Sequence, residues 1–352
     1  MLLRALYGHP DAGTYWEQHA EEHLSSVGFL PIMDWKRSFR HPTLNLMLIV
    51  YVDDFKLAGP AANMAEGWKL IRKGIITGEA EPIGRYLGCE HRMVNATIPQ
   101  GSNPCHGDMP EPFPKVKTPK PFSDDDKVRA MQVKQRAEGP KRQIDYERSH
   151  TPSTPMVKVR IIQYDMRQLF SACVDQYLKL SKTTEKALQK KAPTLYLADD
   201  EKGYDETREL KGELQHIAAK VIMKILYGAR MARYDLLHSC QIFACNNNKW
   251  TKRCDQRLFR IVSYLHQSLE LTMFGWVGED SKNWRLWLYT DADFAADKST
   301  SKSVSGVFCA MCGPTTFFPL CALSKKQGAV SHSTAESEMV AADLGLRTEA
   351  LP

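Results

Sequence analysis

The stretch LIVYVDDFKLAG, at residues 48–59, decides the fold of the first part of the chain. The residues before its two aspartates are apolar at both alternating sets of positions, which predicts a strand that is covered on both faces. Phe55, Leu57 and Gly59 begin a return strand, so Asp53 and Asp54 are expected at the bend of a β-hairpin. Two adjacent carboxylates repel each other, and burial would add to that cost unless cations or strong donors lay between them.

Two interpretations of this aspartate pair are open. Aspartate is a common turn residue, because it tolerates the left-handed backbone region and bonds its own backbone. Alternatively, a tight bend between buried strands holds carboxylates at the exposed rim of a rigid sheet, where hydrated divalent cations can reach them. Phosphoryl transfer by two metal ions requires carboxylates of this kind.

Composition places the chain among ordinary globular proteins. Its 352 residues are 43% apolar and 25% charged, enough for two or three domains with cores of their own. The longest apolar runs are shorter than a membrane span, and the first residues do not resemble a secretory signal. Nine scattered cysteines favour a reducing, intracellular location, cytoplasmic or nuclear. The net charge of +6 and the basic tracts at residues 115–120 and 186–191 could favour contact with phosphates, although such tracts are commonly only solvated.

Four stretches of the chain differ in composition and hydrophobic pattern. Residues 1–93 are compact; residues 94–155 are rich in proline and charge and predict a disordered insertion; residues 156–280 predict helices; and residues 281–352 predict strands followed by a helix. Two apolar stripes predict amphipathic helices, and Asp255 is expected to cap the start of one of them. Ser333 and Glu336 have the spacing of a capping box, which predicts the start of a further helix. The two stripes comprise Leu258, Ile261, Val262, Leu265 and Leu269, and Leu210, Leu214, Ile217, Val221 and Ile225.

The first stretch resembles the reverse transcriptase domain of Copia-type retrotransposon polyproteins. The resemblance rests on ALYGHPDAGTYWEQH at residues 5–19, GF at 28–29, YVDDFKLAG at 51–59 and RYLGCEH at 85–91. It implies a polymerase palm in which Asp53 and Asp54 are catalytic and bind metal. The family's other palm aspartate lies upstream of the LYG segment and is expected to be missing here.

The last stretch resembles the RNase H domain that follows the polymerase in the same polyproteins. YTDADFAADKSTSKSVSGVF at residues 289–308 and SKKQGAVSHSTAESEMVAA at 324–342 carry this resemblance. The resemblance assigns metal binding and catalysis to Asp291 and Glu338, with Glu336 as the alternative to Glu338. Asp291 is expected on the first strand of this stretch, facing the helix that starts near Ser333. The connecting helices match too, although Tyr234 stands where the family usually has proline. A further catalytic aspartate is expected on a later strand that the chain does not reach.

Together the two resemblances imply a mixed α+β chain: a partial reverse transcriptase palm, a helical thumb and connection, and an incomplete RNase H-like domain, truncated at both ends. The parent activity would be RNA-directed DNA synthesis coupled to RNA cleavage in RNA–DNA hybrids, with Mg²⁺ or Mn²⁺ as cofactor. Its partners would be an RNA template, DNA, dNTP and other parts of the polyprotein, and no membrane. Whether this chain is itself an enzyme stays open, and the alternatives are a non-catalytic remnant that at most binds nucleic acid and a structural protein whose aspartates make turns.

Several other residues have a structural and a functional interpretation. Asp293 and Asp297 are expected in a loop, and His332 is expected to lie exposed before the helix. Cys309 and Cys312 have metal-ligand spacing, but their apolar surroundings favour buried strand positions. Core packing is also favoured over base stacking for three tryptophans, Trp16, Trp250 and Trp276.

Overall fold

The computed structural model describes residues 9–100, 155–189, 192–197, 210–246, 250–297 and 300–351. The chain divides into two compact units, Met1–Leu87 and Gly88–Leu351. Both contain helices and antiparallel sheet, so the predicted mixed α+β class is confirmed.

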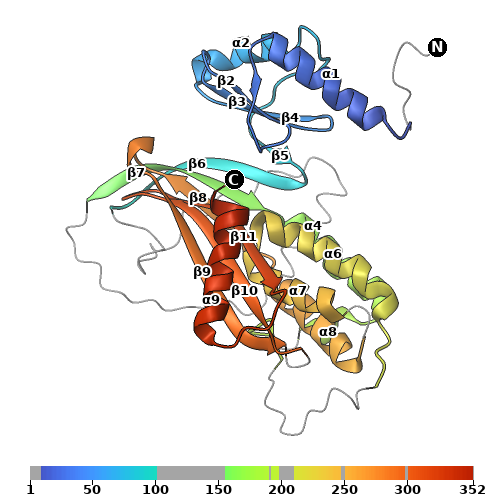
Figure 1. Ribbon diagram of the computed structural model, residues 1–352. Helices are drawn as coiled ribbons and strands as arrows, with labels where there is room; N and C mark the ends of the chain where they lie inside the picture. Colours follow the sequence, from blue (N-terminus) through green and yellow to red (C-terminus); the bar gives the residue numbers. More distant parts are fainter. Residues whose placement is uncertain are drawn as a thin grey trace. The chain divides into compact units, whose positions relative to one another are not determined.

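The first unit is a four-stranded antiparallel sheet with two helices (Figure 1). The strand order β1-β2-β3-β4 follows the chain, so each strand pairs with its sequence neighbour. The elements are α1 (Ala12–Ser26), β1 (Leu30–Pro31), β2 (Ser38–His41), β3 (Leu46–Tyr51), β4 (Asp54–Ala58) and α2 (Ala61–Ile71), followed by the short β5 (Arg85–Tyr86).

The core of this unit lies on one face of β3. Leu46, Leu48 and Val50 are buried there, with Leu24 of α1 and Ile71 of α2 in the same cluster. Of the alternate residues of β3, which the sequence predicted to be covered as well, Met47 and Ile49 are half-buried and Tyr51 is exposed. This difference in burial fixes the register, because a shift by one residue would move the leucines out of the core.

The second unit is built on a larger antiparallel sheet. From one side to the other, its strands lie in the order β6-β7-β8-β11-β10-β9, which brings together segments far apart in the sequence (Figure 1). These strands are β6 (Cys89–Pro99), β7 (Met156–Asp165), β8 (Met273–Val277), β9 (Arg285–Asp297), β10 (Lys302–Cys312) and β11 (Phe317–Lys326).

Strands β6 and β7 correct the predicted boundaries of the insertion. Residues 94–99, which the sequence assigned to the insertion, belong to β6, and residues 156–165, assigned to the helical stretch, form β7. The two strands pair in register from Glu90 with Asp165 to Pro99 with Met156, and the Gln100 amide donates to the Pro155 carbonyl at 2.7 Å. The rest of the predicted insertion, residues 101–154, lies outside the described residues.

Helices occupy the stretch between β7 and β8, as the sequence predicted. Their bounds are α4 (Arg167–Ser181), α5 (Glu185–Leu188), α6 (Gln215–Ala232), the 3-10 turn η3 (Tyr234–Leu236), α7 (Leu237–Asn246) and α8 (Lys252–Gln267). The predicted stripe of α8 is confirmed, because Leu258, Ile261, Val262 and Leu265 are all buried in one cluster with residues of α4, α6 and α7.

Two details of these helices differ from expectation. Leu210 is 70% exposed and precedes α6, so the stripe of that helix begins later than predicted. Asp255 does not cap α8, which begins after Thr251; its carboxylate instead accepts from the backbone amides of Glu213 and Leu214 at 2.7 and 3.0 Å. Those amides lie just before α6, so the aspartate stabilises the start of a different helix.

Arg233 and Tyr234 connect the helices to other parts of the second unit. Arg233, only 4% exposed, forms a two-pronged ion pair with Asp235 and donates to the Ser268 carbonyl. The Tyr234 hydroxyl donates to the Leu320 carbonyl of β11, and its ring lies 6.2 Å from that of Phe308 on β10. Tyrosine at this position therefore makes a contact with the sheet that proline could not make.

The chain continues after β11 into α9 (Thr334–Gly345) and a short π-helical turn, η5 (Leu346–Ala350). The predicted capping box is confirmed: Ser333 Oγ accepts from the Glu336 amide at 3.2 Å, and the Glu336 carboxylate accepts from the His332 amide at 2.6 Å. α9 crosses β9 and β10 (Figure 1). Each described helix is too short or too polar to span a membrane.

Candidate functional site

The aspartate pair lies at a two-residue hairpin turn. Tyr51 and Asp54 are the last paired residues of β3 and β4, so the bend consists of Val52 and Asp53, and Asp54 is already in the strand. The prediction that both aspartates occupy the bend is thus wrong by one residue. Val52 has a φ of 54°, a left-handed conformation that is rare for a β-branched side chain. Trp16 Nε1 holds the turn by donating to the Val52 carbonyl at 2.9 Å.

Both aspartate side chains face solvent. Asp53 and Asp54 are exposed, as are Tyr51 and Val52 beside them. The charge of Asp54 reaches Tyr86, whose pKa is raised mainly by burial and further by this carboxylate. Lys56, which lies on β4 with Asp54, has its Nζ 5.0 Å from the centre of the Tyr86 ring. A hydrated cation could reach this tip, but the hairpin itself offers it only the carboxylates of two adjacent residues.

Asp291 lies on the face of β9 away from α9. Successive side chains of a strand alternate between its faces. A Cβ on Gly345 of α9 would lie 3.3 Å from Leu288 and 3.1 Å from Thr290, so α9 packs against the even-numbered residues. Tyr289 lies on the other face, with its ring stacked 5.9 Å from Phe308, and Asp291 follows it there. The prediction that Asp291 faces the helix is therefore not met.

Glu338, the proposed partner of Asp291, is half-buried in α9. Because α9 covers the opposite face, the two carboxylates could share an ion only around the outer side of β9, which is the last strand of the sheet. Glu336, the fallback, is exposed and engaged in the capping box. Asp293 lies within β9 rather than in a loop, and Asp297, its last residue, forms an ion pair with Lys326.

The fit of a metal ion to these positions is incomplete. Throughout the described part of the chain, no group of three or more His, Cys, Asp or Glu side chains is arranged to hold a metal ion. Hard divalent cations take six or more oxygen ligands and are held well only where several come from the protein. Asp53 and Asp54 are adjacent carboxylates at the hairpin tip, whereas Asp291 and Glu338 lie on opposite sides of β9.

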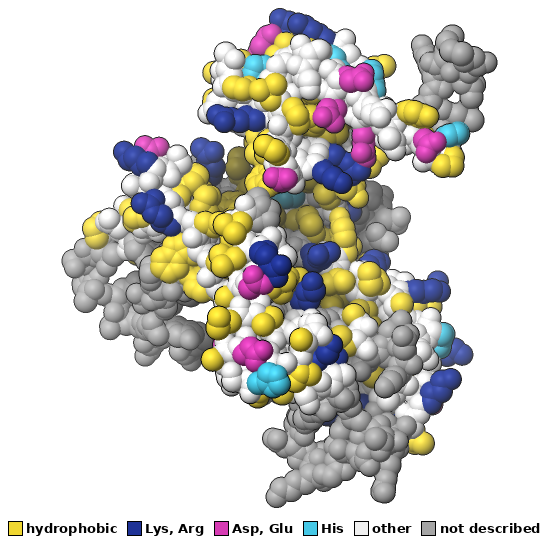
Figure 2. Space-filling model, viewed as in Figure 1, with side chains coloured by type: hydrophobic (Ala, Val, Ile, Leu, Met, Phe, Trp, Pro, Cys, Tyr) yellow, Lys and Arg dark blue, Asp and Glu magenta, His cyan; other side chains and the backbone are white. Residues whose placement is uncertain are grey.

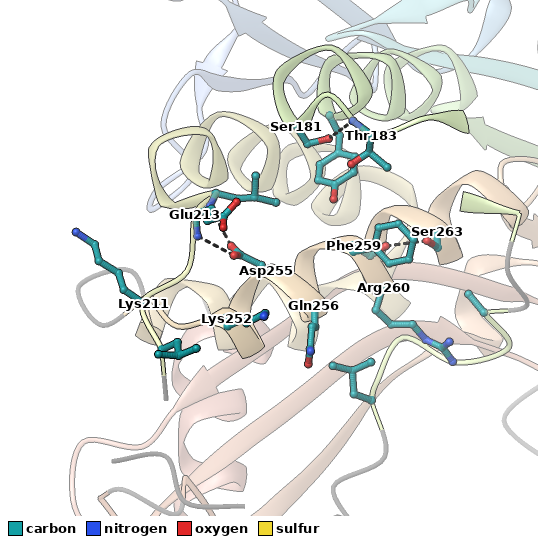
Figure 3. A pocket seen from close by; sticks show the side chains of 15 residues that line it. Ser181, Thr183, Lys211, Glu213, Lys252, Asp255, Gln256, Phe259, Arg260 and Ser263 are labelled. Atoms are coloured by element: carbon teal, nitrogen blue, oxygen red, sulfur yellow. Dashed lines mark hydrogen bonds between the residues drawn. The ribbon is translucent and has the colours of Figure 1, made fainter. Parts of the chain in front are cut away.

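A cleft in the second unit was not predicted from the sequence. It has a volume of about 750 Å³ and lies between the end of α4, the residues before α6, and α8 (Figure 3). Charged side chains around it are Lys211, Lys252, Arg260 and Glu213, while Asp255 is taken up by the backbone amides described above. The lining segments are far apart in the sequence, so no local motif could have indicated the cleft. Two lining residues, Leu197 and Leu210, flank residues outside the described ranges.

Charged side chains of both signs are mixed, with apolar ones between them, on the one face of the described chain that Figure 2 shows. The basic tract at residues 115–120 lies outside the described residues, as do Lys190 and Lys191 of the second tract.

The structural interpretations of several other residues are confirmed. Cys309 and Cys312 are buried in β10, and Trp250 and Trp276 are 4% and 2% exposed. Trp16 packs, partly buried, against the core of the first unit. His332 is exposed before α9.

Compared with known proteins, the chain matches no family model, no curated protein and no solved structure. The resemblance to Copia-type polyproteins therefore remains a prediction from the motifs themselves.

Proposed function

We propose that this chain derives from the reverse transcriptase and RNase H region of a Copia-type polyprotein and that its two acidic sites bind Mg²⁺ or Mn²⁺ weakly. Alone, it is not expected to synthesise DNA or to cleave the RNA strand of an RNA–DNA hybrid. The two-metal mechanism needs enough carboxylates to hold both ions at a fixed separation, and the two carboxylates expected at each site of this chain are too few.

The observation that carries this proposal is the exposed aspartate pair on the strained hairpin tip. A simple turn has no need of Val52 in a left-handed conformation, because glycine or asparagine would occupy it at a lower cost. Strain of this kind is characteristic of functional sites, where the surrounding structure maintains it. The C-terminal order of three antiparallel strands and a helix supports the second half of the proposal, through the motifs at residues 289–308 and 324–342.

Calorimetric titration with Mn²⁺ tests the proposal. We expect a dissociation constant of about 1 mM, the range of weakly coordinated divalent sites, and loss of the heat signal when Asp53→Asn and Asp291→Asn are combined. The matched control combines Asp34→Asn and Asp280→Asn, two exposed aspartates elsewhere in the same units, and should bind as the parent chain does. Identical titrations for all three proteins would show that neither Asp53 nor Asp291 binds a metal ion.

A second candidate function is metal-independent binding of nucleic acid, which the three cations around the cleft favour. The same proteins can be mixed with a labelled RNA–DNA hybrid and followed by fluorescence anisotropy. Binding that persists in EDTA, weakens with salt and is unchanged by the aspartate substitutions would support this second function over the first.

A further inference from the structure

Two cysteines face each other across adjacent strands of the second unit. Cys309 of β10 and Cys321 of β11 are direct partners in the antiparallel register. Partners of this kind have Cα atoms about 4.5 to 5.5 Å apart, which lies within the range of disulfide-bonded cysteines. Directly paired residues of adjacent antiparallel strands project from the same face of the sheet, so the two thiols lie on one side of it.

The surroundings of the two thiols differ. Cys309 is fully buried, whereas Cys321 is partly exposed. The Glu349 carboxylate, on the η5 turn that ends the described chain, lies near enough to the Cys321 thiol for its charge to act on it. Burial first, and then the Glu349 charge, raise the pKa of Cys321, and burial raises that of Cys309. Both groups are therefore protonated thiols at neutral pH and react slowly.

We propose that Cys309 and Cys321 form a latent disulfide, closed by a small disulfide oxidant such as oxidised glutathione. The Cys321 thiolate attacks one sulfur of the oxidant, forming a mixed disulfide and expelling one glutathione thiolate. The Cys309 thiolate then attacks the Cys321 sulfur and expels the second. The two cysteines lose two electrons and two protons, and one oxidised glutathione becomes two reduced molecules.

Disulfide formation has a structural consequence at Glu349. The Cys321 thiol lies near this half-buried carboxylate and has a hydrogen that it can donate to it, whereas a disulfide sulfur has none. Losing that donor leaves the carboxylate without this contact, so η5 is expected to open more often. Oxidation at the sheet is thus coupled to the last turn of the described chain.

Mass spectrometry of the full chain treated with oxidised glutathione tests the proposal. We expect the loss of two hydrogens and, after chymotryptic digestion, a peptide that joins Cys309 to Cys321. Cys309→Ser and Cys321→Ser should each abolish this linkage. Cys312→Ser and Cys245→Ser are the matched controls and should retain it, because Cys312 pairs with Phe317 and Cys245 is exposed on α7.

Two rate and exchange measurements on the same samples separate this proposal from incidental oxidation. Glu349→Gln removes the charge that raises the Cys321 pKa, and the linkage should form faster, by roughly threefold per unit by which the pKa falls. Hydrogen exchange at residues 346–351 should increase on oxidation of the parent chain and be unchanged in Cys321→Ser. Absence of the linked peptide from the folded parent chain, or its appearance only after denaturation, would overturn the proposal.

Discussion

At the scale of single residues, Val52 is the most informative position in the first unit. It carries a β-branched side chain at a φ of 54° in a turn held by the Trp16 indole. The left-handed region costs an L-residue about 1 to 2 kcal/mol, because its Cβ approaches the following carbonyl oxygen. The fold tolerates this cost because β3 is held by its buried Leu46 and Leu48, and β4 pairs with it and packs Leu57, partly buried, against the same core.

Val52→Gly is therefore expected to stabilise the hairpin, by about 1 kcal/mol after the larger unfolded-state entropy of glycine is counted. Slower hydrogen exchange of the β3 and β4 amides would report this gain. Asp53→Gly is the matched control: its φ is not positive, so glycine removes no strain and should speed exchange. Equal effects of the two substitutions would show that the left-handed turn is not strained.

Orientation is what the sequence leaves undetermined at this scale. The hairpin and its exposed aspartates followed from alternation alone, because β3 and β4 are neighbours in the chain. Asp291 was placed on a strand correctly, but the face that α9 would cover depends on packing around Gly345, to which the motif gives no clue. Asp255 likewise had the right residue type for a helix start, but it serves a segment about forty residues away in the sequence, at Glu213 and Leu214.

At the scale of elements, the start of α9 shows how reliable a local signal can be. The Ser333 hydroxyl accepts from the Glu336 amide, the Glu336 carboxylate accepts from the His332 amide just before the cap, and the helix begins where the capping box predicts. The cap matters because only three residues of α9 are buried, Ser337, Ala341 and Gly345, and all are small, so packing adds little to hold its first turn.

Ser333→Ala should accordingly lower the free energy of unfolding by about 1 kcal/mol, the usual value of an N-cap hydroxyl. Urea denaturation followed by circular dichroism measures the change. Thr334→Ala, one residue further on, is the control, because the Thr334 hydroxyl is exposed and alanine favours the helix interior. A loss as large for Thr334→Ala as for Ser333→Ala would mean that the hydroxyl of Ser333 does not act as the cap.

Strands whose partners are distant were the elements that the sequence failed to indicate. β6 buries only Cys89, His91 and Ile98, and the exposed positions in its second half, Asn95 and Thr97, are polar, so residues 94–99 resemble the insertion that follows them. What makes them a strand is the pairing with β7, which lies beyond residues 101–154. Helices of the second unit were found more easily, because their apolar stripes are complete within each segment.

At the scale of the whole molecule, the second unit depends on contacts between remote segments. β8 brings β7 and β11 into one sheet and pairs with β11 at a single position, Trp276 with Phe317. The core there is formed by residues from β6, β7, β8, β10 and β11 together. The long separation between β6 and β7 adds to the entropy lost when this sheet forms, because a longer loop is more costly to close.

Replacing residues 101–154 with a short Asn-Gly loop tests this account of the second unit. The ends already meet, since Pro99 pairs with Met156 and the Gln100 amide donates to the Pro155 carbonyl, so the short loop requires no change of register. Closing a loop more than ten times shorter should raise the free energy of unfolding by about 2 kcal/mol, measured by urea denaturation. A chain with residues 101–154 scrambled but equally long should be as stable as the parent, because length alone sets the closure entropy. If the shortened chain instead loses protection of the β6 and β7 amides, residues 101–154 contribute contacts to the sheet and the pairing of these strands is not self-sufficient.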